Sequence, residues 1–353
     1  MKIKSVLKIF AVFIGLVLVL AIGLVGWLTV TEFNPDEVEE QVVFGDSERK
    51  TVLNEKITVL TFNMGYGNLG KEADSFLDGG KDVRSGDKET VLENLEGIKN
   101  LIKEKDADIL LIQEVDEDSK RSYGINQVKI LGETAGGEYS LGHNYVCDYV
   151  PFPIPTIGKV RSGVMTVSDF ETEKAERISL PCPFSWPVSA ANLKRCLLVT
   201  YYDIEGTDKK LAVINLHLEA YDDGEGKIAQ TKMLWEILKS EYAKGNYVIA
   251  GGDFNQTFPG SLEKYPIKNP ELWTPGILEE SDLPDGWQYV YDDSNPTCRL
   301  LNEPYNPESE NTQYYIIDGF IISPNVELLS VETINMEFEY SDHNPVLMEI
   351  ILK

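Results

Sequence analysis

Five apolar runs of this chain have, at one end, a side chain that can ligate a cation or transfer a proton. These side chains are Asn63, Glu114, His217, Asp253 and His343, and only three histidines occur in the 353 residues. If the carboxylates meet, two of them about 4 Å apart repel by roughly 4 kcal/mol at an effective dielectric near 20, so a positive charge must offset them. Carboxylate and carboxamide oxygens suit Mg²⁺ or Mn²⁺ better than zinc. The pattern therefore predicts a site for a hard divalent cation, with Glu114 and Asn63 as the first candidate ligands.

The same residue types meet the requirements of phosphoester cleavage. A phosphodiester repels nucleophiles because it is negatively charged, so its cleavage needs a Lewis acid on the phosphoryl oxygens, an oriented water and stabilisation of the leaving oxygen. An imidazole paired with a carboxylate has a raised pKa and a fixed tautomer. It can then act as an acid or base near neutral pH, a contribution of typically about 10²- to 10⁴-fold to the rate.

Strands and helices must bring these run ends together. Apolar residues recur at helical spacing from Lys88 to Lys105, between the first two runs, which predicts a strand–helix–strand order. A second helix is predicted from Lys227 to Lys244. Further strands are predicted over residues 163–167, 196–201, 211–215, 247–250, 314–322 and 346–352, and long loops over residues 65–87, 151–159 and 256–313. Together these elements predict one α/β domain of about 300 residues.

An uncharged apolar run from Ile9 to Val30 precedes this domain. At about 1.5 Å per residue it spans the roughly 30 Å hydrocarbon core of a bilayer, which predicts one transmembrane helix. A cleaved signal peptide is the alternative, but the apolar part of a signal peptide is normally about 7 to 15 residues long and no typical cleavage site follows the run.

The distribution of charge predicts how this helix is oriented. Three lysines precede the run and all 58 acidic residues follow it, so residues 1–8 are expected to be a basic cytoplasmic tail and residues 9–30 a single-pass anchor in the cell membrane. Residues 31–55 are predicted to be an acidic linker, and residues 56–353 an extracytoplasmic catalytic domain. Beyond the anchor, 29 basic and 58 acidic residues give a formal charge of −29. This charge disfavours nucleic acid as a partner, because lysine and arginine contacts to phosphate supply nearly all non-specific affinity.

Other polar residues lie outside these runs. His143 is predicted to be structural, and Arg161 and Arg299 to be solvated loop residues. The four cysteines show neither C-x-x-C nor Cys/His spacing, so structural zinc is not expected. Disulfides and buried free thiols both remain open, including a bridge between Cys182 and Cys196.

The order of the motifs resembles the endonuclease/exonuclease/phosphatase superfamily, which includes deoxyribonuclease I, bacterial sphingomyelinases and inositol polyphosphate 5-phosphatases. The resemblance runs from about Lys56 to Leu352 and depends on Gln113-Glu114, Asn215-Leu-His217, Gly252-Asp-Phe-Asn255 and Ser341-Asp-His-Asn-Pro345 in that order. Each motif alone is common, whereas their ordered conjunction is specific. The resemblance implies an α/β fold, a four-layer sandwich of two mixed β-sheets flanked by helices, with the site at one end between the sheets. Here one N-terminal transmembrane helix would precede it.

The resemblance also implies a role for each candidate residue. Asn63 and Glu114 would belong to the metal site, with Asp342 as a second metal-binding or water-orienting carboxylate. His343 would be the catalytic histidine, and Asp318 would orient it. The remaining implied roles are catalytic for His217, Asp253 and Asn255 and, on a weaker match, substrate phosphate contact for Arg195.

The leading hypothesis is a membrane-anchored, extracytoplasmic, Mg²⁺-dependent hydrolase of a phosphodiester or phosphomonoester, with Mn²⁺ as the alternative metal. Its expected substrate is a phosphorylated small molecule or a lipid headgroup. Two alternatives remain: an extracellular endo- or exonuclease, and a non-catalytic surface module that binds a phosphorylated ligand or a partner protein. Metal-dependent turnover that is lost in His343→Ala and Asp253→Ala would exclude the non-catalytic module.

Overall fold

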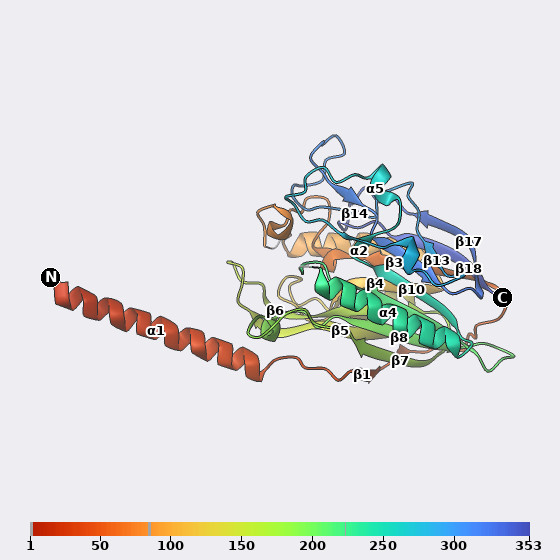
Figure 1. The fold of residues 1–353 in the computed structure, drawn as a ribbon, viewed down its shortest axis with the longest axis horizontal. Coiled ribbons are helices and arrows are strands. Elements are labelled where there is room, and N and C mark those ends of the chain that lie inside the picture. The colour runs from red at the N-terminus through yellow and green to blue at the C-terminus, as the bar shows by residue number, and fades with distance from the viewer. Residues whose placement is uncertain (1–2, 84–85, 223) are drawn as a thin grey trace.

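Two mixed β-sheets face each other in the computed structural model, which describes residues 3–83, 86–222 and 224–353 (Figure 1). In spatial order, the first sheet consists of β1 (Val38–Gln41), β7 (Thr172–Ser179), β8 (Cys196–Asp203), β9 (Lys210–His217), β10 (Tyr247–Asp253), β16 (Asp318–Ile322) and β13 (Gln288–Val290). The second consists of β17 (Val326–Thr333), β18 (Val346–Leu352), β3 (Lys56–Asn63), β4 (Ile109–Asp116), β6 (Gly158–Ser168), β5 (Glu138–Val150) and β2 (Phe44–Gly45). Both sheets are mixed, because β9 runs parallel to β10 and β3 runs parallel to β4.

Helices cover the outer faces of both sheets. The apolar core between the sheets receives side chains from each, such as Leu111 from β4 and Ile249 from β10. On the outside, α4 (Glu225–Ala243) packs on the first sheet, and α2 (Lys88–Lys105) and α3 (Gln127–Ala135) pack on the second. The order helix, sheet, sheet, helix confirms the four-layer sandwich implied by the resemblance.

Local sequence explains the boundaries of α2, which connects the two parallel strands β3 and β4. Asp87 caps its first turn, because its carboxylate accepts a hydrogen bond of 2.9 Å from the backbone N–H of Thr90. The helix ends at Lys105, and the next residue, Asp106, caps it in a left-handed conformation with φ of 45°. Leu95 and Ile98 belong to the buried face that the apolar spacing predicts.

The long loops contain only short elements. These are the 3-10 turns η1 (Gly65–Gly67), η2 (Phe76–Asp78), η3 (Val188–Ala191) and η4 (Glu280–Asp282), the helix α5 (Ser261–Lys264), and the strands β11 (Gln256–Thr257), β12 (Gly276–Ile277), β14 (Cys298–Arg299) and β15 (Tyr314–Tyr315). The predicted loops are thus confirmed in part, because β6 begins within the one over residues 151–159 and β13 of the first sheet lies within the one over residues 256–313. The strand predicted over residues 314–322 is divided into β15 and β16. Arg84 and Ser85, within the predicted loop 65–87, lie outside the described residues.

Besides β13 and the strands before β3, the elements α3, β5, β7 and β17 were not expected from the sequence. In β7 half of the residues are charged, and only Ala175 and Arg177 are buried, so the strand lacks an apolar alternation. In β5 the pairing with β6 shifts register between His143 and Tyr145 and again further along, which disrupts the two-residue period. Hydrogen bonds to neighbouring strands stabilise these segments where local patterning does not.

The segment expected to be a linker is part of the sandwich. β1 pairs with β7 and β2 pairs with β5, so residues 38–45 add an edge strand to each sheet. Thr51 is fully buried, and Leu53 packs against the core between the sheets. The expectation of a free tether is therefore wrong for this part of residues 31–55. Edge strands are held by backbone hydrogen bonds and need few apolar side chains. The acidic segment that contains β1 and β2 therefore lacks an apolar alternation from which these strands could be predicted.

The first helix, α1 (Ile3–Val30), projects away from the sandwich (Figure 1). Residues Leu7–Val30 have a mean hydropathy of 3.0, and their length and composition fit a membrane span. A signal sequence near an N-terminus has the same properties. Met1 and Lys2 of the predicted tail lie outside the described residues, and the rest of that tail continues α1.

Two arginines expected to be solvated loop residues differ from this expectation: Arg299 is buried, and Arg161 lies in a strand although its side chain is 43% exposed. The guanidinium of Arg299 is fully buried, and it donates hydrogen bonds to the backbone carbonyls of Gly70 at 2.9 Å and Glu303 at 3.1 Å. It thereby ties the loop after β3 to the loop before β15. Arg161 lies in β6 and pairs with Glu117.

All four cysteines are free thiols, so Cys182 and Cys196 are not bridged. Cys147, Cys196 and Cys298 are buried, whereas Cys182 is exposed. The buried thiols behave as small apolar side chains of the core.

Candidate active site

The register of three adjacent strands places three candidate residues in one row. Asp253, at the end of β10, lies opposite His217 of the parallel β9 and opposite Asp318 of the antiparallel β16. Residues directly opposite each other in a sheet project to the same face. The row therefore collects two carboxylates and one imidazole from segments that are far apart in the sequence.

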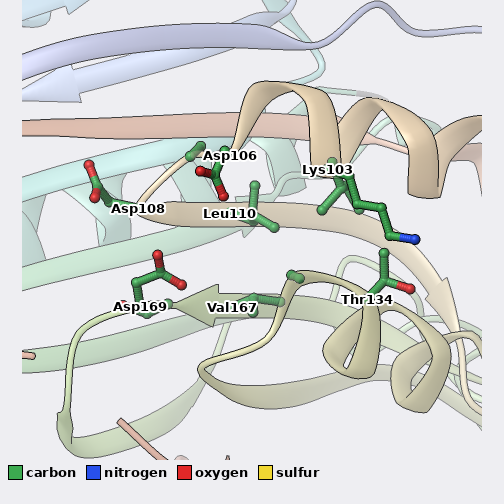
Figure 2. A pocket seen from close by; sticks show the side chains of 11 residues that line it. Lys103, Asp106, Asp108, Leu110, Thr134, Val167 and Asp169 are labelled. Atoms are coloured by element: carbon green, nitrogen blue, oxygen red, sulfur yellow. The ribbon is translucent and has the colours of Figure 1, made fainter. Parts of the chain in front are cut away.

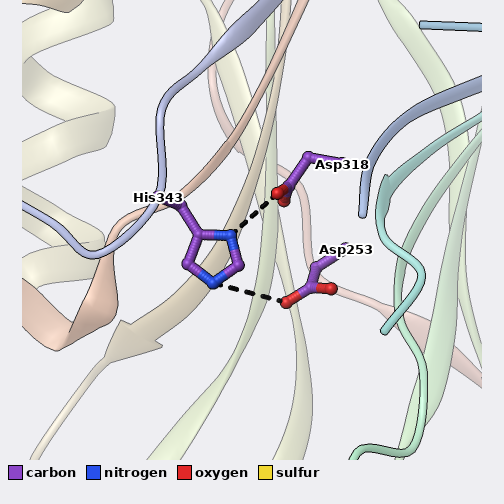
Figure 3. A group of neighbouring side chains, drawn as sticks. All are labelled: Asp253, Asp318 and His343. Atoms are coloured by element: carbon purple, nitrogen blue, oxygen red, sulfur yellow. Dashed lines mark hydrogen bonds and ion pairs between the residues drawn. The ribbon is translucent and has the colours of Figure 1, made fainter. Parts of the chain in front are cut away.

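His343 completes this row from the opposite sheet. Its Nδ1 lies 2.8 Å from Oδ2 of Asp318, and its Nε2 lies 3.8 Å from Oδ2 of Asp253 (Figure 3). Burial is the largest single effect and lowers the pKa of His343, but the charges and hydrogen bonds of Asp318 and Cys298 together raise it, so the net pKa lies well above the ordinary value. Asp318 itself is buried, which raises its pKa to about 6 despite the neighbouring imidazole. The pair therefore shares a proton inside the protein, with Nε2 directed away from Asp318.

Asp253 is held by donors on several sides. The side-chain amide of Asn63 donates to its Oδ2 at 3.0 Å, and Nε2 of His217 lies 3.5 Å from the same oxygen. The backbone N–H of Asn255 donates to its Oδ1 at 2.8 Å, while the Asn255 side chain donates to the carbonyl of Leu218. These contacts fix the orientation of the Asp253 carboxylate.

His217 and Glu114 face each other across the site. Nδ1 of His217 lies 4.0 Å from Oε1 of Glu114. The nearby carboxylates favour a charged imidazole, but burial, together with the charges of Arg195 and His343, lowers the pKa of His217 well below its ordinary value. Because the His217 side chain is only 6% exposed, the effect of burial prevails and the imidazole is neutral near pH 7.

Glu114 occupies a distorted position in β4. The pairing of β4 with β6 shifts register between Ile112 and Val115, and Glu114 adopts a left-handed backbone conformation with φ of 57°. Its Oε2 is buried without a hydrogen-bond partner. Burial, followed by the charge of Asp342, raises the pKa of Glu114 to about 8. A carboxylate in this state is suited to a cation, which would offset its burial and the charge of Asp342.

One cavity of about 750 Å³ connects these residues. It is lined by eight of the nine residues predicted from the sequence, namely Asn63, Glu114, Arg195, His217, Asp253, Asn255, Asp342 and His343. Asp318 does not line the cavity and contacts Nδ1 of His343, which does. The guanidinium of Arg195 pairs with Glu219 at 3.2 Å and donates to the carbonyl of His217 at 3.1 Å, so its charge is already partnered.

A model of the endonuclease/exonuclease/phosphatase family matches residues 60–343. The chain belongs to this family. Its members are hydrolases that act on phosphoester bonds. No curated protein sequence matches the chain.

Solved structures agree with the family fold. A family protein from Beutenbergia cavernae aligns with a TM-score of 0.59 at 15% identity, over 84% of this chain and 72% of that one. One from Bacteroides vulgatus aligns with a TM-score of 0.53 at 16% identity, over 85% of this chain and 100% of that one. ANGEL2, a 2′,3′-cyclic phosphatase in complex with adenosine-2′,3′-vanadate, aligns with a TM-score of 0.54 at 16% identity, over 89% and 99%. At these identities the likeness establishes the fold.

A second cavity, of about 110 Å³, lies at the other end of β4, between α2, α3 and β6 (Figure 2). Asp106, Asp108 and Asp169 line it. The carboxylate of Asp108 is occupied, because it accepts from Thr58 and pairs with Arg49. From residue 108 to residue 114 the strand rises about 20 Å at roughly 3.3 Å per residue, so this cavity is remote from the family site.

Several residues of the site were not found from the sequence. Arg121 lies 3.2 Å from the centre of the Tyr66 ring, and both line the cavity. The hydroxyl of Tyr221 donates to Asp78 at 3.3 Å, beside the ring of Trp273. All five come from loops or strand ends without a motif, so the sequence contains no local signal for them.

Proposed function

We propose that the protein is a membrane-anchored phosphoesterase that hydrolyses a phosphodiester or phosphomonoester, with Mg²⁺ or Mn²⁺ as cofactor and its catalytic domain outside the cytoplasm. The observation that supports it most is the arrangement of Asp318, His343 and Asp253. A buried imidazole is held by one carboxylate at 2.8 Å and directs its other nitrogen toward a second carboxylate that lines a large cavity. This geometry suits proton transfer to and from a substrate in the cavity.

Glu114 and Asp342 are the residues that would hold the divalent cation, with the carboxamide of Asn63 as a further oxygen donor. The unpartnered Oε2 of Glu114 and the raised pKa of both acids, each buried, fit this assignment. When bound, the cation would polarise the phosphoryl oxygens and offset the crowded carboxylates. One ligand atom each from Asp253, Asp318 and His343 also lie within 4.8 Å of one another. We assign that group to proton transfer instead, because Asp318 is already bonded to the imidazole.

Asp253, His343 and Asp318 carry out the proton transfers that accompany hydrolysis. Asp253 accepts a proton from the attacking water, whose oxygen forms a bond to phosphorus while the bond to the leaving oxygen breaks. Nε2 of His343 donates a proton to that leaving oxygen, and Asp318 keeps the imidazole oriented and charged. Neutral His217 and the backbone of Asn255 hold the Asp253 carboxylate in position.

The test is turnover by the full chain in detergent of a water-soluble substrate, bis(p-nitrophenyl) phosphate, with Mg²⁺, Mn²⁺ or EDTA. We expect metal-dependent release of nitrophenol that EDTA abolishes and that His343→Ala and Asp253→Ala each reduce at least 100-fold, within the roughly 10²- to 10⁴-fold range of acid–base catalysis. His143→Ala is the matched control, since His143 lies on β5, pairs with Glu117 at 3.0 Å and does not line the cavity. If His343→Ala and Asp253→Ala turned over the substrate as fast as the parent and the His143→Ala control, the catalytic assignment would be wrong. DNA cleavage that weakens steeply with salt would instead favour a nuclease.

A further inference from the structure

The catalytic cavity extends to the first helix. Leu24, Val25 and Leu28 of α1 line the same cavity as Asp253 and His343. Leu28 is 6% exposed and packs in a small apolar cluster of the domain beside β5 and η3. The helix is therefore part of the wall of the candidate active site.

Polar contacts hold this end of α1 against the domain. The indole N–H of Trp186 donates to the Thr29 hydroxyl at 2.9 Å. Just after the helix, Nζ of Lys194 lies 2.7 Å from Oε1 of Glu32, and both of these side chains are largely buried. Since β1 follows and joins the first sheet, the end of α1 has a defined position relative to the cavity.

The length of the helix places the part of α1 that lines the cavity near a bilayer surface. The 24 residues Leu7–Val30 span about 36 Å at roughly 1.5 Å per residue, compared with a hydrocarbon core of about 30 Å. If α1 spans the membrane, its last two turns lie at the boundary between the acyl chains and the headgroups. The residues of α1 that line the cavity are in these turns.

Exposed apolar side chains surround the same end of α1. The most exposed are Phe152 at 70%, Ile154 at 89% and Trp186 at 62%, and Leu77 and Val188 are also exposed. The loops after β5 and before β8 lie at the end of the domain from which α1 projects (Figure 1). Residues 149–158 and 178–193 contain no charged residue, although 25% of the chain is charged. On an acidic surface, a cluster of this kind marks a contact with an apolar medium.

We propose that Leu77, Phe152, Ile154, Trp186 and Val188 form a membrane-contacting rim, and that the substrate is a membrane phospholipid. Its phosphate would reach Asp253 and His343 while its apolar part lies against the cavity wall formed by α1. The inference rests on the proposed phosphoesterase function. The bilayer is the occupant that the rim fits, because the rim is continuous with a membrane-spanning helix.

The experiment uses the full chain in nanodiscs of phosphatidylcholine and compares three substrates: the phospholipid in the disc, its deacylated glycerophosphodiester and bis(p-nitrophenyl) phosphate. We expect the phospholipid to be hydrolysed at least tenfold faster than its deacylated form. Ile154→Asp, at a side chain that does not line the cavity, should reduce phospholipid turnover at least tenfold and leave nitrophenol release unchanged. Leu329→Asp, at an exposed apolar residue of β17, should change neither activity.

Equal turnover of the phospholipid by the parent and Ile154→Asp would show that the rim does not contribute to membrane contact. Equal turnover of the acylated and deacylated substrates would show that the apolar wall of the cavity does not bind the acyl chains. A complete lack of nitrophenol release would contradict the proposed function instead.

Trp186 provides a second measurement, which does not depend on activity. Its fluorescence, taken as the difference between the parent and Trp186→Phe, should be quenched by brominated acyl chains in the disc. Unquenched Trp186 would show that the rim does not contact the membrane.

Discussion

The segment before β3 allows a direct test of how the sandwich is stabilised. We compare a chain that begins at Glu32 with one that begins at Asn54. Both lack α1, so their difference isolates residues 32–53. The shorter chain loses the pairing of β1 with β7, and it loses three backbone hydrogen bonds in which Glu37, Arg49 and Thr51 accept from Ser179, Glu171 and Glu205.

The structure sets the size of the expected effect. A segment that is ordered in the folded protein must dock with at least about 1.4 kcal/mol, which corresponds to tenfold occupancy. Three backbone hydrogen bonds contribute roughly 1 kcal/mol each net, and Leu53 packs against the core between the sheets. We therefore expect the free energy of unfolding to fall by about 2–4 kcal/mol.

Urea unfolding followed by circular dichroism measures this difference. With a slope of roughly 3 kcal/mol per M, the midpoint of the shorter chain should lie about 1 M lower. Val42→Ala in the longer chain is the matched control, because Val42 lies between β1 and β2 and is 65% exposed. Midpoints that agree within about 0.2 M would refute the reasoning and restore residues 31–55 as a passive linker.

Four further outcomes follow from single side chains. Glu114→Gln should lower the affinity for Mn²⁺ at least tenfold in titration calorimetry, whereas Glu117→Gln, whose carboxylate pairs with an arginine, should not; equal affinities would remove Glu114 from the metal site. Asp318→Asn should reduce turnover of a soluble diester by about 10²- to 10⁴-fold, and unchanged turnover would show that Asp318 does not serve His343. Arg299→Met leaves buried carbonyls unpaired and should lower the free energy of unfolding by about 2–4 kcal/mol in urea; a smaller change would show that water replaces these bonds. Burial raises the pKa of Asp78 to about 6, so between pH 4 and 6 the folded protein binds more protons than the unfolded chain. The free energy of unfolding of the parent, relative to that of Asp78→Asn, should therefore fall by up to about 3 kcal/mol as the pH rises through this window. If the difference between the two proteins did not change with pH, the pKa of Asp78 would not be raised.

Much of the fold was accessible from the sequence because its central strands are strongly patterned. β3, β4, β9 and β10 are apolar runs buried on both faces, and α2 has clear caps and an apolar stripe. The edge segments were missed for the opposite reason. β1 and β7 are half exposed and charged, and their backbone hydrogen bonds depend on partners that are far away in the sequence.

The site divides in the same way. Residues at the ends of patterned strands could be found, because those ends meet at one edge of the fold and contain motifs. The environment of each residue could not be found. The distortion of β4 at Glu114 and the partnering of Arg195 by Glu219 arise from contacts between distant segments. For the same reason, the contribution of α1 to the cavity was not visible in a sequence that suggested only an anchor.

The row formed by His217, Asp253 and Asp318 has a consequence for how new specificities can arise. Its spacing is set by the repeat of the main chain across three strands, so the stretch of residues 265–287 between α5 and β13 can change length without displacing it. A single extra residue inside β10 would instead turn its side chains to the opposite face. Grafting that stretch from other family members is thus a practical route to altered substrate preference, with the chemistry left intact.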